Sequence, residues 1–342
     1  MTRATYDRTI VITGAAGFIG LHLARHLRGS SPNARIVLID NFQRGERDAD
    51  YRQFWHEHAD HLLEFDVDLT CCEAVGEVGN FLQWKIDDVY HLAAVNGTAA
   101  FYDRPADVLD TNVRTLQNVL DLIKLARGHT GDQPPPRLLF TSSNEAYAGA
   151  LEAFKHLPIP TPERVPLVIA DPYNPRWSYA ASKLVGELMV IHTAKRDGFP
   201  AVIVRPHNFY GPRSGTGHVI PQMLRRIQDR VDPFPIAGHN ETRSFCYIAD
   251  AVDAIARAIE VASVEVPTFH IGSTSETRIG ALAQMLFMLA RWEPASIDYK
   301  TSPPGSVARR LPDVTKIEDV IGWSATTSLH DGLARTAEWY WR

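Results

Sequence analysis

Short apolar runs alternate with helix-like segments over most of the chain. The runs are rich in β-branched and large apolar residues, as in 10–12 and 36–39, which is typical of parallel strands buried on both faces. Between them, apolar residues recur at the 3.6-residue spacing of an amphipathic helix. The pattern predicts strands at 10–12, 36–39, 62–69, 88–94, 137–143, 201–205 and 269–272, and helices near 18–27, 105–127, 178–196, 220–231, 247–261, 277–292 and 328–341.

This alternation predicts an α/β fold with a Rossmann-like, doubly wound parallel sheet. Residues 1–206 carry the pattern, and 245–273 adds a helix and a strand that we expect to return to the same sheet. The periodicity is looser in 207–244 and 274–342, which predicts a smaller C-terminal α+β domain made from these two segments. Between 149 and 176 proline is frequent and no periodicity is clear, so we expect a surface excursion there.

A glycine-rich turn separates the first predicted strand from the first predicted helix. Gly14, Gly17 and Gly20 let the backbone approach a pyrophosphate, and the N–H groups at the start of the helix point toward its negative charge. Asp40 ends the second predicted strand, twenty residues after Gly20, where a carboxylate accepts hydrogen bonds from an adenosine ribose and repels a 2′-phosphate. The motif therefore favours NAD over NADP. The alternative is a tight packing turn with no cofactor, because such a turn also needs glycine.

Composition and charge argue against several classes of protein. The 342 residues are 45% hydrophobic and 22% charged, which indicates an ordered, enzyme-sized protein. The net charge of −5, with acidic and basic residues interspersed, gives no basic footprint for nucleic acid and no polybasic membrane patch. We find neither a long apolar run nor a signal pattern, so we expect a cytoplasmic protein. Cys71, Cys72 and Cys246 show no zinc-ligand spacing, and we predict no metal site.

The candidate chemistry centres on Tyr179 and Lys183, four residues apart and therefore on one face of a predicted helix. An ammonium group beside a phenol stabilises phenolate, which gives a base that works near neutral pH. On most helices such a pair is merely solvated. Here Ser143 ends a predicted strand at the carboxyl edge of the sheet, where ligands bind in such folds, and its hydroxyl can hydrogen-bond the same substrate oxygen. Together with the glycine-rich turn, these residues predict hydride transfer.

At this point the chain resembles a known family over nearly its whole length. It is similar to the extended short-chain dehydrogenase/reductases that act on nucleotide sugars, the NAD-dependent epimerase/dehydratase family. The matching pieces are Gly14-x-x-Gly17-x-x-Gly20, Asp40-Asn41, Asp66-Val67, His91-Leu92-Ala93-Ala94, Asn112, the segment 142–147, Tyr179-x-x-x-Lys183, the segment 205–212, Arg243-Ser244-Phe245 and the segment 309–316.

The resemblance implies binding roles for many of these residues. Cofactor contacts would come from Gly14, Gly17, Phe18, Ile19, Gly20, Asp40, Asn41, Asp66, Val67, Leu92, Ala93, Ala94 and Asn112, with Tyr179 and Lys183 at the nicotinamide end. A nucleoside-diphosphate sugar would meet Ser143, Asn144, Asn208, Val219, Arg243 and Arg309. The two arginines would grip its phosphates, and 219–224 with 234–236 would surround its base. For each arginine, a surface salt bridge is the alternative. The resemblance also implies a homodimer through the helices 105–127 and 178–196.

The reaction implied is oxidation of the sugar at C4. Tyr179 would take the hydroxyl proton while Ser143 holds the oxygen and NAD accepts the hydride. A 4-epimerase then turns the keto sugar over, a decarboxylase releases CO2 from a hexuronic acid, and a 4,6-dehydratase loses water. Glu145 matches dehydratases and uronate decarboxylases, so we expect it to be catalytic, although it could simply orient Tyr179 or bind a sugar hydroxyl.

The choice among these reactions stays open in the sequence. Asn144 stands where one large dehydratase group carries an acid, and an amide cannot donate that proton, which weakens the dehydratase interpretation. Family frequency favours an epimerase, with a decarboxylase close behind. The remaining alternatives are a non-catalytic NAD-bound scaffold, against which the intact Ser143, Tyr179 and Lys183 argue, and an NADPH ketoreductase, against which Asp40 argues.

Overall fold

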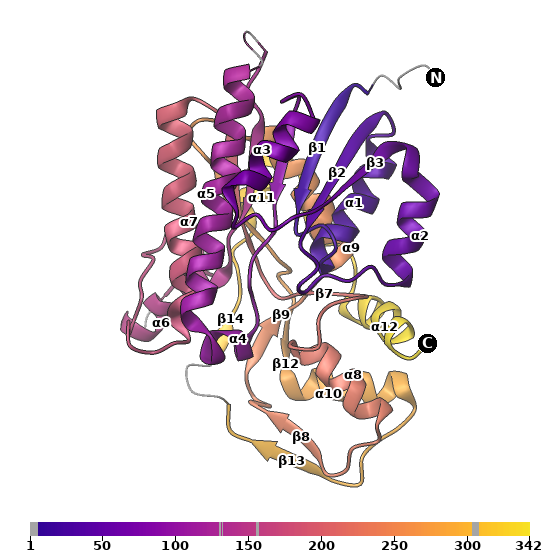
Figure 1. The fold of residues 1–342 in the computed structure, drawn as a ribbon. Helices are drawn as coiled ribbons and strands as arrows, with labels where there is room; N and C mark the ends of the chain where they lie inside the picture. The colour runs from indigo at the N-terminus through magenta and orange to yellow at the C-terminus, as the bar shows by residue number, and fades with distance from the viewer. Residues whose placement is uncertain (1–5, 130, 132, 155–156, 303–307) are drawn as a thin grey trace.

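The computed structural model describes residues 6–129, 131, 133–154, 157–302 and 308–342. A seven-stranded sheet with the order β11-β6-β5-β4-β1-β2-β3 forms its centre (Figure 1). Every neighbouring pair in this sheet is parallel. Its strands are β1 (Arg8–Thr13), β2 (Ala34–Asp40), β3 (Leu62–Asp66), β4 (Asp88–His91), β5 (Arg137–Thr141), β6 (Ala201–Pro206) and β11 (Thr268–Ile271). The predicted Rossmann-like, doubly wound parallel sheet is confirmed.

Helices cover both faces of this sheet because its strands are apolar on both sides. On one face, α5 (Pro105–His129) packs between α3 (Cys72–Phe81) and α7 (Trp177–Asp197). On the other face, α1 (Phe18–Ser30) packs against α9 (Ile248–Ala258). The shorter elements are α2 (Ala49–His58), η1 (Ala59–His61), α4 (Thr98–Asp103), η2 (Asn144–Tyr147), α6 (Ala148–Phe154), η3 (Ile259–Val261) and α11 (Thr315–Ile321).

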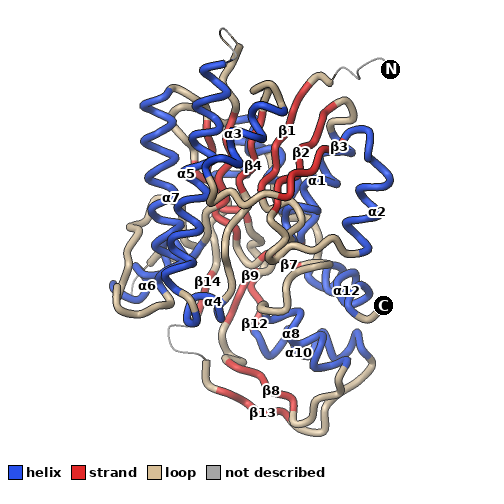
Figure 2. The backbone as a smooth tube through the Cα atoms, viewed as in Figure 1, coloured by secondary structure: helices blue, strands red, loops and turns tan. Residues whose placement is uncertain are grey.

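Most of the remaining elements lie beyond the carboxyl edge of the sheet, at the bottom of Figure 2. The helices are α8 (Val219–Gln228), α10 (Ile279–Ala290) and α12 (Leu329–Tyr340), and the strands are β7 (Phe209–Tyr210), β8 (Phe234–Ala237), β9 (Thr242–Ser244), β10 (Cys246–Tyr247), β12 (Glu276–Arg278), β13 (Ile297–Lys300) and β14 (Arg309–Arg310). The sequence did not predict any of these seven strands, because strands of two to four residues are too short to carry a periodic signal. The exact domain boundaries stay a prediction.

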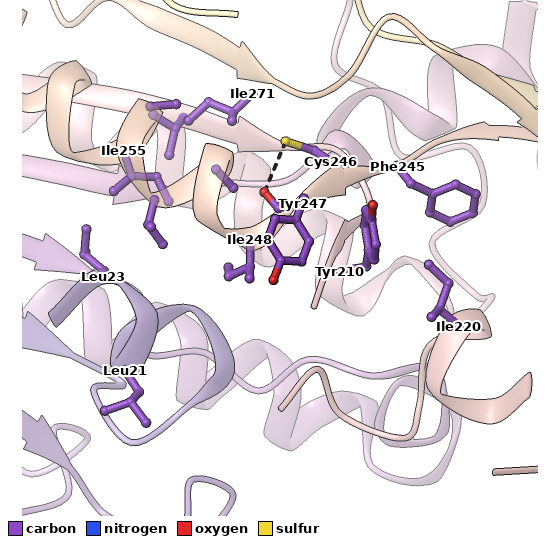
Figure 3. Close-up of a cluster of buried hydrophobic side chains, with 14 of the residues drawn as sticks. Leu21, Leu23, Tyr210, Ile220, Phe245, Cys246, Tyr247, Ile248, Ile255 and Ile271 are labelled. Carbon is purple, nitrogen blue, oxygen red and sulfur yellow. Dashed lines mark hydrogen bonds between the residues drawn. The ribbon is translucent and has the colours of Figure 1, made fainter. Parts of the chain in front are cut away.

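One hydrophobic cluster joins the sheet to these elements (Figure 3). Leu21 and Leu23 of α1 belong to the same buried cluster as Ile220 of α8 and Phe245, which lies between β9 and β10. This packing fixes α1 of the sheet layer against the elements beyond the carboxyl edge. Within the described residues, no helix is both long and apolar enough to cross a membrane.

Candidate active site

The glycine-rich turn forms the floor of the cleft at the carboxyl end of β1. Gly14 has a φ of +70°, and a Cβ there would lie 2.9 Å from the backbone nitrogen of Ala93. A Cβ on Gly20 would lie 2.2 Å from the carbonyl oxygen of Gly14. Gly17 caps the N-terminus of α1 without a side chain, so the first N–H groups of that helix remain accessible to a ligand. This bare backbone cradle fits the diphosphate of a dinucleotide.

Asp40 lies beside this cradle at the end of β2. One of its oxygens accepts a hydrogen bond from the Ala16 N–H at 2.9 Å, and the other accepts one from the Phe42 N–H at 2.9 Å. Burial raises the pKa of the Asp40 carboxyl, while these two bonds act in the opposite direction. The next strand ends alongside, where the Val67 N–H donates to the Asp40 carbonyl at 3.1 Å. Asp66 there forms an ion pair with Arg47 at 2.9 Å.

The segment after β4 forms the adjacent border of the cleft. Thr13 anchors it, because its hydroxyl accepts hydrogen bonds from the N–H groups of Leu92 and Ala93, each at 3.2 Å. Farther along, Asn112 of α5 bonds both the N–H and the carbonyl of Val95, and it donates to the Ser182 hydroxyl at 3.0 Å. The Asn112 amide thus lies behind the segment and ties it to α7, which indicates that Asn112 shapes the cofactor border from behind.

Tyr179, Ser143 and Lys183 come together at the middle of the sheet edge. All three are buried, with Tyr179 and Lys183 on α7 and Ser143 just after β5. Burial raises the pKa of the Tyr179 phenol, whereas a side-chain hydrogen bond with Ser143 lowers it. The Lys183 ammonium donates to the Thr141 carbonyl at 2.8 Å, which fixes it below the phenol ring. The phenol of Tyr179 and the hydroxyl of Ser143 thus lie together at the sheet edge.

Lys183 carries the most consequential pKa shift of these three. Burial lowers the pKa of Lys183 to about 7, although the charge of Glu187 opposes this. The ammonium is therefore only partly protonated at neutral pH in the ligand-free protein. A bound anion nearby would restore its charge.

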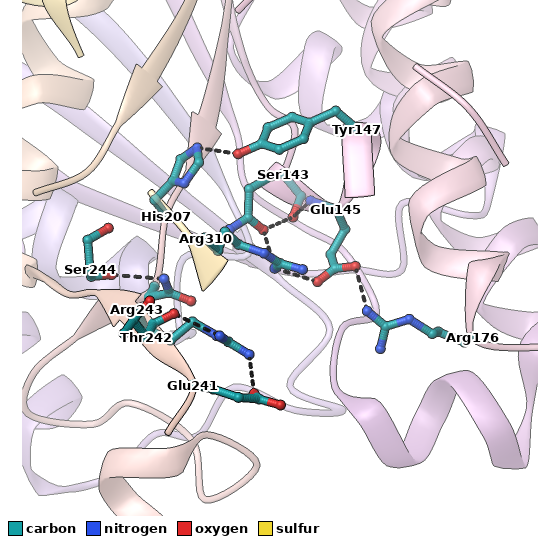
Figure 4. Close-up of polar contacts among 12 residues, drawn as sticks. Ser143, Glu145, Tyr147, Arg176, His207, Glu241, Thr242, Arg243, Ser244 and Arg310 are labelled. Atoms are coloured by element: carbon teal, nitrogen blue, oxygen red, sulfur yellow. Dashed lines mark hydrogen bonds and ion pairs between the residues drawn. The ribbon is translucent and has the colours of Figure 1, made fainter. Parts of the chain in front are cut away.

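Glu145 lies between two arginine side chains next to Ser143 (Figure 4). Its carboxylate pairs with Arg310 at 2.8 Å and with Arg176 at 3.3 Å. Burial disfavours its ionisation, but the charges of Arg310 and Arg176 outweigh burial and hold the pKa of Glu145 below its usual value. Glu145 is thus ionised at neutral pH. We name these three residues the Glu145 cluster.

Arg309, which the resemblance assigns to the substrate phosphates, lies outside the Glu145 cluster. Arg309 is exposed and forms a bidentate ion pair with Glu276 of β12, with distances of 2.8 and 2.9 Å. Its neighbour Arg310 is the one buried against Glu145 and the Asn144 side chain. The physical reason is that successive side chains of a strand point to opposite faces, so β14 can aim only one of the two arginines at the site.

The other predicted substrate residues border a separate cavity of about 270 Å³. Asn208, Val219 and Arg243 all line it. Arg243 donates to Glu241 at 2.8 Å, and burial lowers its pKa. Asn208 donates to the Ser244 carbonyl at 2.8 Å, which fixes the loop after β6. The cavity therefore brings a guanidinium group close to an apolar wall formed by α8.

Two members of the Glu145 cluster, Arg176 and Arg310, were not singled out in the sequence. Arg176 stands three positions before Tyr179, directly ahead of α7, so its sequence position placed it near the active site. For Arg310, strand alternation at an Arg-Arg pair was the available signal, but β14 itself was not predicted.

Comparison with known proteins places these features in a family. Residues 10–272 match the model of the NAD-dependent epimerase/dehydratase family. UDP-N-acetyl-alpha-D-glucosaminuronate decarboxylase of Bacillus cytotoxicus is 28% identical over 96% of this chain and 97% of its own. A dTDP-4-dehydro-6-deoxy-D-allose reductase of Streptomyces is 29% identical over 97% of this chain and 96% of its own.

The fold has close structural counterparts as well. The crystal structure of UDP-glucose 4-epimerase with UDP-glucose from Thermotoga maritima superposes with a TM-score of 0.81, covering 97% of this chain and 98% of that one, at 24% identity. At this identity the likeness concerns the fold. The family match covers most of the chain and includes the turn, the sheet edge and the Tyr179–Lys183 pair. The chain belongs to the NAD-dependent epimerase/dehydratase family, and its cofactor is NAD.

Proposed function

We propose that this enzyme decarboxylates a nucleoside-diphosphate hexuronic acid. The observation that carries the proposal is the Glu145 cluster, in which two guanidinium groups share one carboxylate directly beside Ser143. The cluster has an excess positive charge in a buried setting. A second carboxylate, such as that at C6 of a hexuronate, would complete the pairing.

The chain's residues support oxidation at C4 as the first step. NAD, when bound, accepts the hydride from C4 and later returns it. Tyr179 as phenolate removes the proton from the C4 hydroxyl, and Ser143 donates a hydrogen bond to the same oxygen. Lys183, fixed by the Thr141 carbonyl, favours the phenolate when its amine is protonated.

Decarboxylation then follows from the chemistry of the ketone. With a carbonyl at C4, the C6 carboxylate belongs to a β-keto acid, so the C5–C6 bond breaks with release of CO2 and the electron pair moves toward the C4 oxygen. Ser143 and the protonated Tyr179 lie where they stabilise that oxygen. A proton added at C5 gives a 4-keto pentose, and return of the hydride to C4 with a proton from Tyr179 to the oxygen would complete the pentose product. In this scheme Arg310 and Arg176 orient the departing carboxylate.

The Glu145 cluster favours this reaction over the two related ones. A dehydratase needs an acid for the leaving hydroxyl, but Glu145 is held ionised and Asn144 is an amide. A 4-epimerase, which family frequency favoured in the sequence, must let the keto sugar turn over. Ion pairs from Arg310 and Arg176 to the C6 carboxylate would hold the keto sugar in one orientation and so oppose that rotation.

The test is incubation with a panel of nucleoside-diphosphate hexuronates and hexoses, followed by mass spectrometry. Loss of about 44 Da from a hexuronate supports the proposal, since the ketone chemistry releases CO2. Loss of about 18 Da would show a dehydratase, an isomer of unchanged mass an epimerase, and gain of about 2 Da from a keto sugar with added reduced cofactor a reductase. Each of the last three outcomes contradicts the proposal.

We further infer a homodimer that pairs α5 and α7 with their copies. These two helices pack together, and large apolar side chains stay exposed on them, including Leu109, Leu125, Val185 and Leu188. Burying such side chains is the usual source of stability in a helical interface. Light scattering tests this directly. A dimer that Leu188→Glu converts to a monomer supports the inference, and a wild-type monomer contradicts it.

A further inference from the structure

Arg44 has a cationic side chain that the reaction scheme leaves unused. It belongs to the loop between β2 and α2, and it is exposed at the cleft. This loop crosses the glycine-rich turn so closely that a Cβ on Gly45 would lie 2.7 Å from the Ala16 Cβ. Throughout the described part of the chain, no hydrogen bond or ion pair engages the Arg44 guanidinium. Its charge is therefore available to a ligand.

Arg213 holds this loop in place. Its guanidinium pairs with Asp48 at 2.7 Å and donates to the Ala16 carbonyl at 3.2 Å, and it is nearly fully buried. From the C-terminal helix α12, the Trp339 indole donates to Asp50 at 2.6 Å. We call the two facing segments, 41–50 and 211–218, the clasp. Because these contacts fix the loop, the fold determines where the backbone of Arg44 lies.

The Arg44 guanidinium reaches from one side of the clasp to the other. A Cβ on Gly215 would lie 4.0 Å from its terminal nitrogen, and its charge acts on both Tyr179 and His218. Arg44 thus lies over the cleft between Asp40, where the loop begins, and the catalytic phenol.

The dinucleotide must lie under this position. Its adenosine ribose belongs at Asp40 and its nicotinamide ring at Tyr179, so its two phosphates pass between them, above the N–H groups of the glycine-rich turn. The phosphates are its anionic part. We propose that Arg44 binds the diphosphate of NAD from the open side of the cleft, opposite the glycine-rich turn. The guanidinium fork suits two neighbouring phosphate oxygens.

The proposal does not depend on which sugar reaction the enzyme catalyses, because it concerns the cofactor alone. It implies that Arg44 slows the release of NAD. Slow release of NAD matters for any reaction in which one cofactor molecule both takes and returns the hydride, because that molecule must stay bound between the two steps.

The test measures NAD affinity by calorimetry in the absence of any sugar. We expect Arg44→Gln to weaken NAD about tenfold or more, as for loss of a charged hydrogen-bonded contact, and Arg44→Lys to weaken it less. Arg52→Gln is the matched control. It removes the same charge from an exposed position in α2, and it should leave the affinity unchanged.

Ligand fragments separate phosphate binding from a general effect on the loop. ADP-ribose carries the diphosphate and adenosine does not. Arg44→Gln should therefore weaken ADP-ribose about as much as NAD and leave adenosine binding as in the wild type. Wild-type NAD affinity in Arg44→Gln would overturn the proposal. Equal losses of affinity for adenosine and ADP-ribose would also overturn it. A shifted pH profile of turnover with no loss of NAD affinity would overturn it too, because it would show that Arg44 acts on the Tyr179 phenol instead of the diphosphate.

Discussion

The two sides of the cleft are built in different ways. The cofactor side is made of backbone: Gly14 and Gly20 bring main-chain atoms within a distance that no Cβ would allow. The sugar side is made of long side chains from distant segments, since Arg310 meets Glu145 across 165 positions of the chain. A backbone site is encoded locally, whereas a side-chain site depends on tertiary packing. The cofactor side can thus be recognised from a short stretch of sequence, whereas the proposed sugar side cannot.

The largest effect is expected where the two sides meet. Tyr179→Phe should lower turnover by about a thousandfold, because it removes the base, while NAD affinity stays unchanged. Single-turnover reduction of bound NAD by the sugar measures the effect. Tyr173→Phe, at a position that is 94% exposed, is the matched control and should behave as the wild type. Unchanged turnover in Tyr179→Phe would remove Tyr179 from the mechanism.

The cofactor side is tested by adding a methyl group where backbone atoms of the glycine-rich turn lie closest together. In Gly20→Ala the new methyl group would lie 2.2 Å from the Gly14 carbonyl oxygen, so the turn must distort. We expect at least about a hundredfold loss of NAD affinity, because the turn's N–H groups no longer point at one place. Gly29→Ala lies in the same helix, with no atom within 4 Å of the added carbon. It should bind NAD normally and unfold at a slightly higher temperature. Equal NAD affinity in the two variants would refute a backbone-built cradle.

The sugar side is tested by comparing Arg309 and Arg310, which are adjacent in β14. Arg310→Gln should lower kcat/KM for a hexuronate by roughly thirtyfold to a hundredfold, because it leaves Glu145 paired with Arg176 alone and removes the carboxylate's partner. Arg309→Gln breaks only an exposed pair with Glu276 and should change kcat/KM less than about twofold. NAD affinity should be normal in both. A larger effect at Arg309 would restore the original sequence assignment.

The smallest effect concerns stability and pH at Lys183. Its pKa is about 7 in the folded protein against 10.5 as the ordinary value, so the unfolded chain binds more protons between these limits. Burial of the charged Lys183 therefore lowers the free energy of unfolding by its full amount below about pH 7. This penalty shrinks as the pH rises toward 10.5. We expect Lys183→Met to raise the free energy of unfolding more at about pH 6 than at about pH 9. Urea unfolding of both proteins measures this, and a difference that is the same at both pH values would contradict the lowered pKa.

The sequence predicted the fold and the cofactor side because both rest on local signals. Buried strands such as β1 and β2 are continuous apolar runs, and the glycine spacing marks the turn between β1 and α1. The convergence of Ser143 with Tyr179 followed from the rule that ligands bind at the carboxyl edge of a parallel sheet. The sequence alone did not show that Arg176 and Arg310 would converge on Glu145. Ion pairs between distant segments leave no periodic trace, and neither the short polar strand β14 nor the segment before α7 has one of its own.

The most direct measurement of the central claim follows the fate of C6. A nucleoside-diphosphate hexuronate labelled with 13C at C6 is incubated with the NAD-loaded enzyme and observed by NMR. We predict that the label leaves the sugar and appears as carbon dioxide and bicarbonate, and that Arg310→Gln slows its release while Arg309→Gln does not. A label that stays in a nucleotide sugar while C4 is oxidised or inverted would contradict a decarboxylase.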